Sequence, residues 1–168
     1  EAFFAVPMLG STLHTVNIRL SPSQIAYTID HAEDDVILFH ADFIPLLEEV
    51  MLEVKRDARL IVMRDSADIE LPHTTLKIEA IFDELFINTD QYFSFPDFDE
   101  NTRATTFYTT GTTGNPKAVA YSHRQLVLHT MGILATFGPM SANNRFHNRD
   151  VYMPITPMFH VHGWGFPY

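Results

Sequence analysis

The chain has no cysteine and few basic residues: 11 Lys and Arg stand against 21 Asp and Glu, giving a formal net charge of −10. Without cysteine, disulfide bonds and thiolate metal sites are excluded, and an extracellular disulfide scaffold is not expected. Proteins that bind nucleic acid backbones normally present clustered Lys and Arg, so no nucleic acid partner is expected. The missing cysteines favour a cytoplasmic location.

Long apolar runs are also missing. No run approaches the ~18 residues needed to cross a bilayer, so no transmembrane segment is expected. The 168 residues, 46% of them hydrophobic, suffice for one domain with a sizeable core. The sequence starts at Glu1 rather than at a methionine and stops at Tyr168 directly after an apolar cluster. We therefore expect an excerpt of a longer chain.

Apolar runs of two kinds alternate along the sequence, which is the rhythm of an α/β fold. Short runs rich in Val, Ile and Phe predict strands at 11–18, 35–40, 59–64, 104–110 and 118–121. Apolar residues at helical spacing predict helices at 22–32, 43–57, 78–88 and 123–137. The fold class predicted from this order is α/β, a sheet flanked by helices.

Two of these helices have strong start signals. Ser21 precedes Pro22 and is followed by Gln24 three residues later, the pattern of a capping box with proline in the first turn. Ser122 and Gln125 repeat the pattern before the last helix. Gly138 and Pro139 predict the end of that last helix.

A glycine- and threonine-rich loop separates the last two predicted strands. It lies in the stretch FYTTGTTGNPKAVAYSH, residues 107–123, and its tip, residues 111–116, consists of turn formers. Glycines let backbone N–H groups turn inward around an anion, threonine hydroxyls add donors, and Lys117 supplies a positive charge. The composition suits a polyphosphate ligand. An ordinary hairpin turn with a surface lysine would explain the same residues.

The loop is not a Walker A motif. That motif requires glycine directly before the lysine and a hydroxyl residue directly after it. Pro116 and Ala118 occupy those two places here.

Residues 108–119, YTTGTTGNPKAV, resemble instead the phosphate-binding signature of the adenylate-forming superfamily, which includes acyl-CoA synthetases, luciferases and adenylation domains. The usual form is Tyr-Thr-Ser-Gly-Thr-Thr-Gly-x-Pro-Lys-Gly-Val; here Thr110 replaces the serine and Ala118 the last glycine. Residues 151–166 resemble the family's next motif, a strand that runs into an apolar, aromatic turn. Residues 10–34 resemble the upstream segment of the fatty acyl-CoA synthetase branch.

The resemblance implies that residues 1–168 are an internal fragment of the large N-terminal AMP-binding domain, with the C-terminal domain absent. It implies ATP-dependent activation of a carboxylic acid, of medium or long chain in this branch, to acyl-adenylate and then acyl-CoA. ATP, Mg²⁺ and the co-substrate CoA would take part, and a homodimer is left open. The adenine-, ribose- and magnesium-binding residues and a C-terminal lysine would lie beyond this chain, so the fragment alone is expected to be inactive.

The resemblance also assigns residues. Lys117 and His160 would serve catalysis, and Phe159, His160 and Trp164 would line the acyl pocket. No metal site is expected within the chain. The phosphate cradle would consist of Thr109, Thr110, Gly111, Thr112, Thr113, Gly114 and Lys117.

Other interpretations stay open at this point. On an extended segment, His160 and His162 would face one side as a metal-binding pair, or either ring would pack as a neutral core histidine. The parent would alternatively be an aryl or other carboxylate-CoA ligase, or a non-catalytic nucleotide-binding module.

Overall fold

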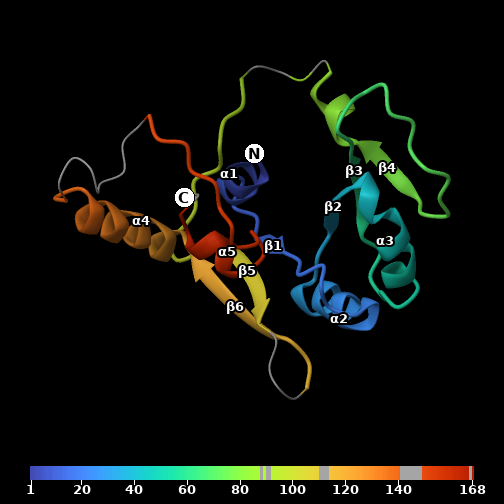
Figure 1. Cartoon of the computed structure of the whole chain (residues 1–168), viewed down its shortest axis with the longest axis horizontal. Helices are drawn as coiled ribbons and strands as arrows, with labels where there is room; N and C mark the ends of the chain where they lie inside the picture. The colour runs from blue at the N-terminus through green and yellow to red at the C-terminus, as the bar shows by residue number, and fades with distance from the viewer. Residues whose placement is uncertain (88, 90–91, 110–113, 141–148, 167) are drawn as a thin grey trace. The chain divides into compact units, whose positions relative to one another are not determined.

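The predicted strands form two separate sheets rather than one. The computed structural model describes residues 1–87, 89, 92–109, 114–140, 149–166 and 168. The chain divides into two compact units, one built from residues 1–17, 95–112 and 117–168 and the other from 18–94 and 113–116 (Figure 1). Each unit contains one three-stranded sheet. The α/β class with flanking helices is confirmed, but the expectation of a single sheet is wrong.

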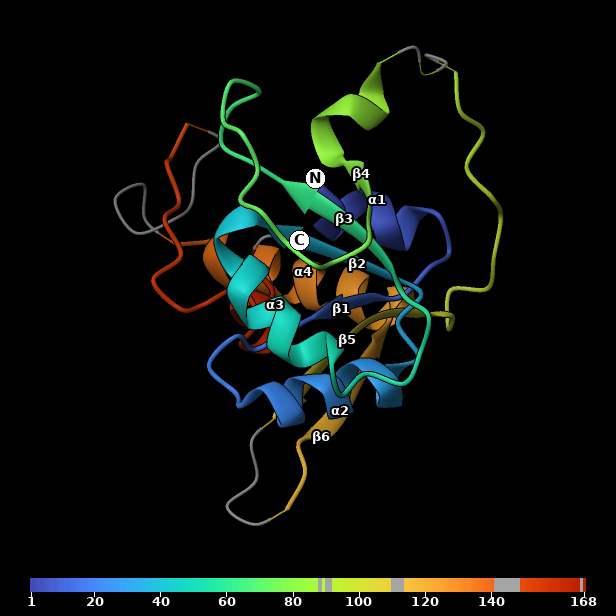
Figure 2. The same cartoon turned by 90° about the vertical axis from the view of Figure 1, so that its right-hand side faces the viewer.

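The second unit contains a parallel sheet in the order β2-β3-β4 (Figure 2). Its strands are β2 (Val36–His40), β3 (Arg59–Met63) and β4 (Ile78–Ile81). Helix α2 (Pro22–Ala32) precedes β2, and a 3-10 turn (Ala41–Phe43) leads from β2 into α3 (Ile44–Met51). The buried apolar side chains come from both helices and from the two first strands: Ile25, Ile29, Phe39, Ile44, Leu47, Val50, Leu60 and Val62.

Helix α3 ends six residues earlier than its apolar pattern predicts. The backbone N–H groups of Lys55 and Arg56 donate to the carboxylate of Asp30 on α2, at 3.1 and 3.3 Å from Oδ1. This carboxylate takes the N–H groups that a longer helix would have used internally. Val54, which falls within the predicted helix 43–57, therefore lies outside α3.

The helix predicted for residues 78–88 is wrong. Ile78–Ile81 forms strand β4 instead, and only Phe82–Phe86 is helical, as a 3-10 turn. The edge of β3 offers unpaired backbone groups, and pairing with them outweighs the helical spacing of the apolar residues. The β-branched Ile78 and Ile81 suit a strand at least as well as a helix.

The first unit contains the mixed sheet β1-β5-β6. Strand β1 (Leu13–Thr15) runs parallel to the central β5 (Arg103–Thr109), which pairs antiparallel with β6 (Lys117–Ser122). Helix α1 (Ala2–Met8) precedes the sheet, α4 (His123–Phe137) follows β6 directly, and α5 (Val161–Trp164) is a single short turn. Residues 104–108 of β5 are all buried.

Both predicted capping boxes are present. Ser21 accepts a hydrogen bond from the backbone N–H of Gln24 at the start of α2, and Ser122 accepts one from Gln125 at the start of α4. In each case the backbone N–H of the serine donates to the Oε1 of the glutamine side chain. Among the described residues, no helix is long and apolar enough to span a membrane.

Candidate functional site

The glycine- and threonine-rich loop connects two of the predicted strands, and these strands pair with each other. The register places Thr109, the last residue of β5, opposite Lys117, the first residue of β6. The Thr109 hydroxyl donates to the carbonyl oxygen of Lys117 at 3.4 Å. The antiparallel ladder therefore fixes where the loop leaves and re-enters the sheet. Of the predicted cradle, Thr110, Gly111, Thr112 and Thr113 lie outside the described residues.

Gly114 needs to be glycine for conformational reasons. Its φ is +95°, in the left-handed region that residues with side chains rarely adopt. A Cβ added there meets no described atom within 4 Å, so space is not the constraint. A backbone of this kind can turn its N–H groups toward an anion.

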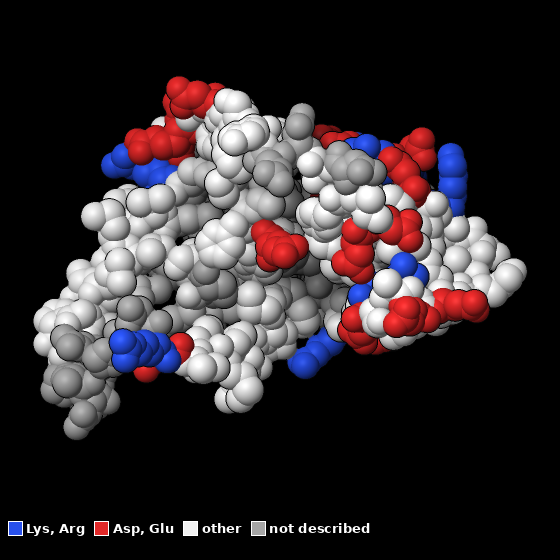
Figure 3. Space-filling view, turned by 90° about the horizontal axis from the view of Figure 1, so that it is seen from above, with Lys and Arg blue, Asp and Glu red and all other residues white. Residues whose placement is uncertain are grey.

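Lys117 is exposed, and no carboxylate of the described residues forms a salt bridge with it. Some arginines are paired: Arg124 lies 2.6 Å from Glu100, and Arg56 lies 2.8 Å from Asp35. On the face shown in Figure 3, most of the basic side chains lie beside acidic ones. An exposed cation at the base of a glycine- and threonine-rich loop can bind an anionic ligand.

The aromatic turn near the C-terminus has a left-handed backbone. Residues 161–165 have φ values of +50°, +52°, +63°, +63° and +71°. Three of them, Val161, His162 and Trp164, carry side chains, and each such residue costs about 1–2 kcal/mol in this conformation. The preceding residues 151–155 form no strand, so the strand expected there is wrong. Strain of this kind persists only where surrounding contacts hold it, and it is concentrated at functional sites.

His162 is one of the contacts that hold the turn. Its side chain is 1% exposed, and its Nδ1 lies 3.3 Å from the Thr15 hydroxyl oxygen on β1. The rings of Phe3, Phe107 and Tyr168 meet it nearly edge-on, with centroids 5.9, 5.1 and 6.1 Å away.

Burial, with a smaller contribution from nearby His14, lowers the pKa of His162 from 6.5 to about 4. His162 is therefore a neutral, packed core histidine, one of the alternatives left open by the sequence. The extended His160–His162 pair is wrong because the backbone is not extended and the two rings diverge: His160 is exposed and contacts Trp164. Among the described residues, no group of three His, Asp or Glu side chains is arranged to hold a metal ion.

A second histidine contacts the same turn from α4. The Nε2 of His129 donates to the carbonyl oxygen of Trp164 at 3.1 Å. A Cβ added to Gly165 would lie 2.5 Å from this Nε2 and is therefore excluded while the ring stays in place. Sequence reasoning gave His129 no role. The only feature of the sequence that could have drawn attention to His129 is its position within an apolar helical run.

The residues predicted to line an acyl pocket lie on or beside this turn. Trp164 is 57% exposed, and its ring meets that of His160 edge-on at 5.8 Å. Phe159 is half-buried.

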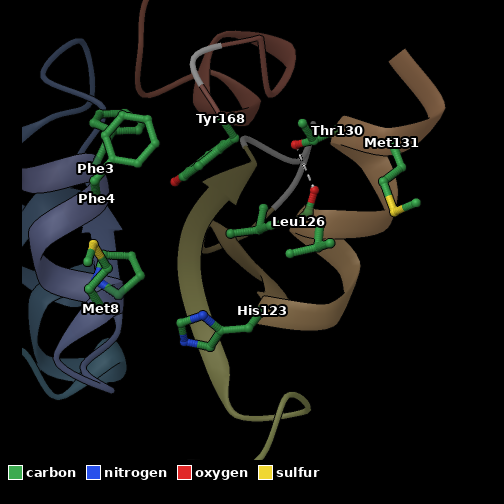
Figure 4. A pocket seen from close by; sticks show the side chains of 10 residues that line it. Phe3, Phe4, Met8, His123, Leu126, Thr130, Met131 and Tyr168 are labelled. Atoms are coloured by element: carbon green, nitrogen blue, oxygen red, sulfur yellow. Dashed lines mark hydrogen bonds between the residues drawn. The ribbon is translucent and has the colours of Figure 1, made fainter. Parts of the chain in front are cut away.

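A different apolar hollow lies between α1 and α4 (Figure 4). Its volume is about 300 Å³. Apolar side chains of both helices face it, with His123 at the start of α4 and Tyr168 beside them. Phe159, His160 and Trp164 do not line it. Sequence reasoning gave no role to the residues of α1 that face this hollow. The residues that line the hollow are Phe3, Phe4, Pro7, Met8, His123, Leu126, Val127, Thr130, Met131 and Tyr168.

Comparison with known proteins gives concordant matches. The family model described as AMP-binding enzyme matches residues 1–168. The 3-methylmercaptopropionyl-CoA ligase of Ruegeria pomeroyi is 42% identical, across 100% of this chain and 30% of its own length. The long-chain-fatty-acid–CoA ligase of Thermus thermophilus is also 42% identical, across 100% of this chain and 28% of its own length.

A solved structure shows the same fold. A natural red-emitting luciferase of Phrixothrix hirtus superposes with a TM-score of 0.70 over 97% of this chain and 30% of the luciferase, at 19% identity. At that identity the likeness concerns the fold alone. The chain thus spans about 30% of the length of the two curated relatives.

Proposed function

The chain belongs to the AMP-binding enzyme family, and from this premise we propose that it is part of the N-terminal domain of an acyl-CoA synthetase. In the proposed reaction, a carboxylate oxygen attacks the α-phosphorus of ATP and pyrophosphate leaves. The CoA thiol then attacks the acyl carbon of the resulting acyl-adenylate, and AMP leaves. Catalysis of the first step requires positioning and containment of phosphate charge.

The observation that carries this proposal is the position of the exposed Lys117 beside the loop. Lys117 stands opposite Thr109 at the mouth of the hairpin and has no described carboxylate partner. We assign Lys117 to the β- and γ-phosphates, with the loop hydroxyls and N–H groups as further donors. Thr109, Thr110, Gly111, Thr112, Thr113 and Gly114 complete the proposed cradle.

Mg²⁺ is proposed as the counter-ion of the nucleotide. The described residues of this chain contain no group of three His, Asp or Glu side chains suited to it. Its protein ligands are therefore assigned to the rest of the enzyme.

We propose a medium- or long-chain fatty acid as the substrate. The fatty-acid ligase of Thermus thermophilus supports this choice. The equally similar relative from Ruegeria pomeroyi, named for a 3-methylmercaptopropionyl group, makes a short thioether acid the second candidate.

We further propose that the enzyme is cytoplasmic and does not bind nucleic acid, on the basis of the missing cysteines and the net charge of −10. A homodimer is a further proposal, which sedimentation of the enzyme would test.

Replacing Lys117 tests the phosphate role. In the whole enzyme, Lys117→Ala should remove a charge-assisted contact of about 1.5–3 kcal/mol and slow ATP–pyrophosphate exchange about 10- to 150-fold. Lys77→Ala, at another exposed lysine, is the matched control and should leave exchange unchanged. An exchange rate and ATP dependence unaffected by Lys117→Ala would exclude the assignment.

Replacing Trp164 tests the acyl pocket. Its exposure of 57% in this chain favours a role in lining a pocket over a place in the core. Trp164→Ala should change the discrimination between acids that differ in chain length by about 1–3 kcal/mol. A core role would instead cost about 3–5 kcal/mol of stability and lower kcat/KM for all acids alike. An unchanged ratio of kcat/KM values with a lowered Tm would refute the pocket role.

A further inference from the structure

The left-handed turn that carries Trp164 is held from two directions. His162 is anchored from within the first unit, against Thr15 and three aromatic rings. His129 reaches the turn from α4, where its Nε2 meets the carbonyl oxygen of Trp164 at 3.1 Å. The turn is thus held at residue 162 through its side chain and at residue 164 through its carbonyl oxygen. Together they supply contacts that a strained backbone requires in order to persist.

The roles of donor and acceptor in the His129 contact follow from its partner. A carbonyl oxygen only accepts, so the Nε2 of His129 must carry the proton. Gly165 makes the approach possible because a Cβ at this position would lie 2.5 Å from Nε2 and 2.7 Å from Cδ2 of His129. Its φ of +71° also favours glycine. The hydrogen bond from His129 to Trp164 therefore requires that residue 165 have no side chain.

The contact bears on the direction of the Trp164 side chain. The indole is 57% exposed, and the ring contact that the structure gives it is the edge-on meeting with His160. Since its side chain is loosely packed, its direction depends mainly on the backbone conformation of residue 164. That conformation is left-handed, with a φ of +63°, and His129 binds its carbonyl group.

We propose that His129 is a positioning residue that sets the direction of the Trp164 indole and thereby the chain-length selectivity of the enzyme. The selectivity part rests on the proposed acyl-CoA synthetase function. Loss of the donor lets the backbone at Trp164 relax from its strained conformation and moves the indole. The hydrogen bond is exposed, so the change in selectivity should be about 2- to 10-fold.

Four variants of the whole enzyme test this proposal. His129→Leu removes the donor, and His129→Gln keeps an N–H donor at a similar reach. Gln125→Ala is the matched control: it removes the 2.8 Å bond from the Ser122 backbone N–H to Gln125 Oε1, so it weakens the start of α4 without touching the turn. Trp164→Phe assigns the Trp164 signal in ¹⁹F spectra of enzyme labelled with 5-fluorotryptophan.

Two measurements are made on the wild type and on the variants of His129 and Gln125: the ¹⁹F resonance of residue 164, and the ratio of kcat/KM for octanoate to that for palmitate. His129→Leu should shift or broaden the resonance and change the ratio about 2- to 10-fold. His129→Gln should restore both. Gln125→Ala should lower Tm and leave both unchanged.

An unmoved resonance and an unchanged ratio in a folded His129→Leu enzyme would overturn the proposal, as would equal effects from Gln125→Ala. If His129→Leu does not fold, His129→Asn replaces it, since its amide is too short to keep the contact. A resonance that differs between the Asn and Gln variants supports the proposal, and identical resonances overturn it. If the wild type activates no carboxylic acid, the proposed function fails, and the ¹⁹F resonance alone still decides whether His129 positions Trp164.

Discussion

His162 should make the stability of the protein depend on pH between 6.5 and 4. Its pKa in the folded state is lowered to about 4 from 6.5, because burial and the nearby His14 disfavour the charged imidazolium. In this interval the unfolded chain binds a proton that the folded chain does not. Stability is therefore fully present above pH 6.5 and declines as the pH falls toward 4.

The two pKa values give the size of the effect. Linkage between pH 7 and pH 5 predicts a loss of at most about 2 kcal/mol from His162. His162→Phe has no proton to bind and fits the edge-on aromatic surroundings, so the loss attributable to residue 162 should disappear. All other titrating groups remain in both proteins, so the difference between the two stability profiles isolates residue 162.

Urea denaturation followed by circular dichroism at pH 7, 6, 5.5 and 5 measures both profiles. His162→Phe is expected to be less stable at pH 7, because it loses the contact with Thr15, and to have the flatter profile. Parallel profiles for the two proteins would refute the reasoning, because they would mean that His162 binds its proton equally in the folded and unfolded states.

Three further changes test other parts of the structure. Gly165→Ala should cost about 1–2 kcal/mol for the left-handed backbone and displace the His129 ring, which loses a bond worth about 0.5–1.5 kcal/mol. In a His129→Ala background only the cost of the left-handed backbone should remain. Denaturation of the wild type, the two single variants and the double variant measures both costs, and an equal cost of Gly165→Ala in the two backgrounds would contradict the coupling. Gly132→Ala within α4 should stabilise the protein by about 0.5–1 kcal/mol, since the added Cβ meets no described atom within 4 Å; a lowered Tm would contradict this. The backbone N–H of Thr75 and the hydroxyls of Thr74 and Thr75 lower the pKa of Glu48 below 4.5, so the stability from this carboxylate is present above pH 4.5 and is lost as the pH falls through its folded pKa. Glu48→Gln should flatten the acid limb of a Tm profile, and an unchanged limb would exclude this contribution.

Features that depend on neighbours in the sequence could be predicted from the sequence. The capping boxes at Ser21 and Ser122 need only a serine and a glutamine three residues later, because all their hydrogen bonds close within one helical turn. The hairpin between β5 and β6 is equally local. Its two strands are joined by turn-forming residues, so the antiparallel pairing of Thr109 with Lys117 follows from the chain itself. The resemblance to the adenylate-forming superfamily was also visible in the sequence. The phosphate cradle assigned from that resemblance stays a prediction.

Features that depend on distant partners could not be predicted in this way. The apolar spacing of residues 78–88 suits a helix, but the open edge of β3 pairs with Ile78–Ile81. The end of α3 is set by the carboxylate of Asp30, which reaches Lys55 and Arg56 from another helix.

The left-handed turn at residues 161–165 depends most strongly on the tertiary structure. No local preference favours this backbone at Val161, His162 or Trp164, and an isolated segment would relax from it. It exists because Thr15 and three aromatic rings enclose His162, while His129 binds the carbonyl group of Trp164. Those groups are brought together from β1, β5, α1, α4 and Tyr168, so only the folded chain can supply the free energy that offsets the strain.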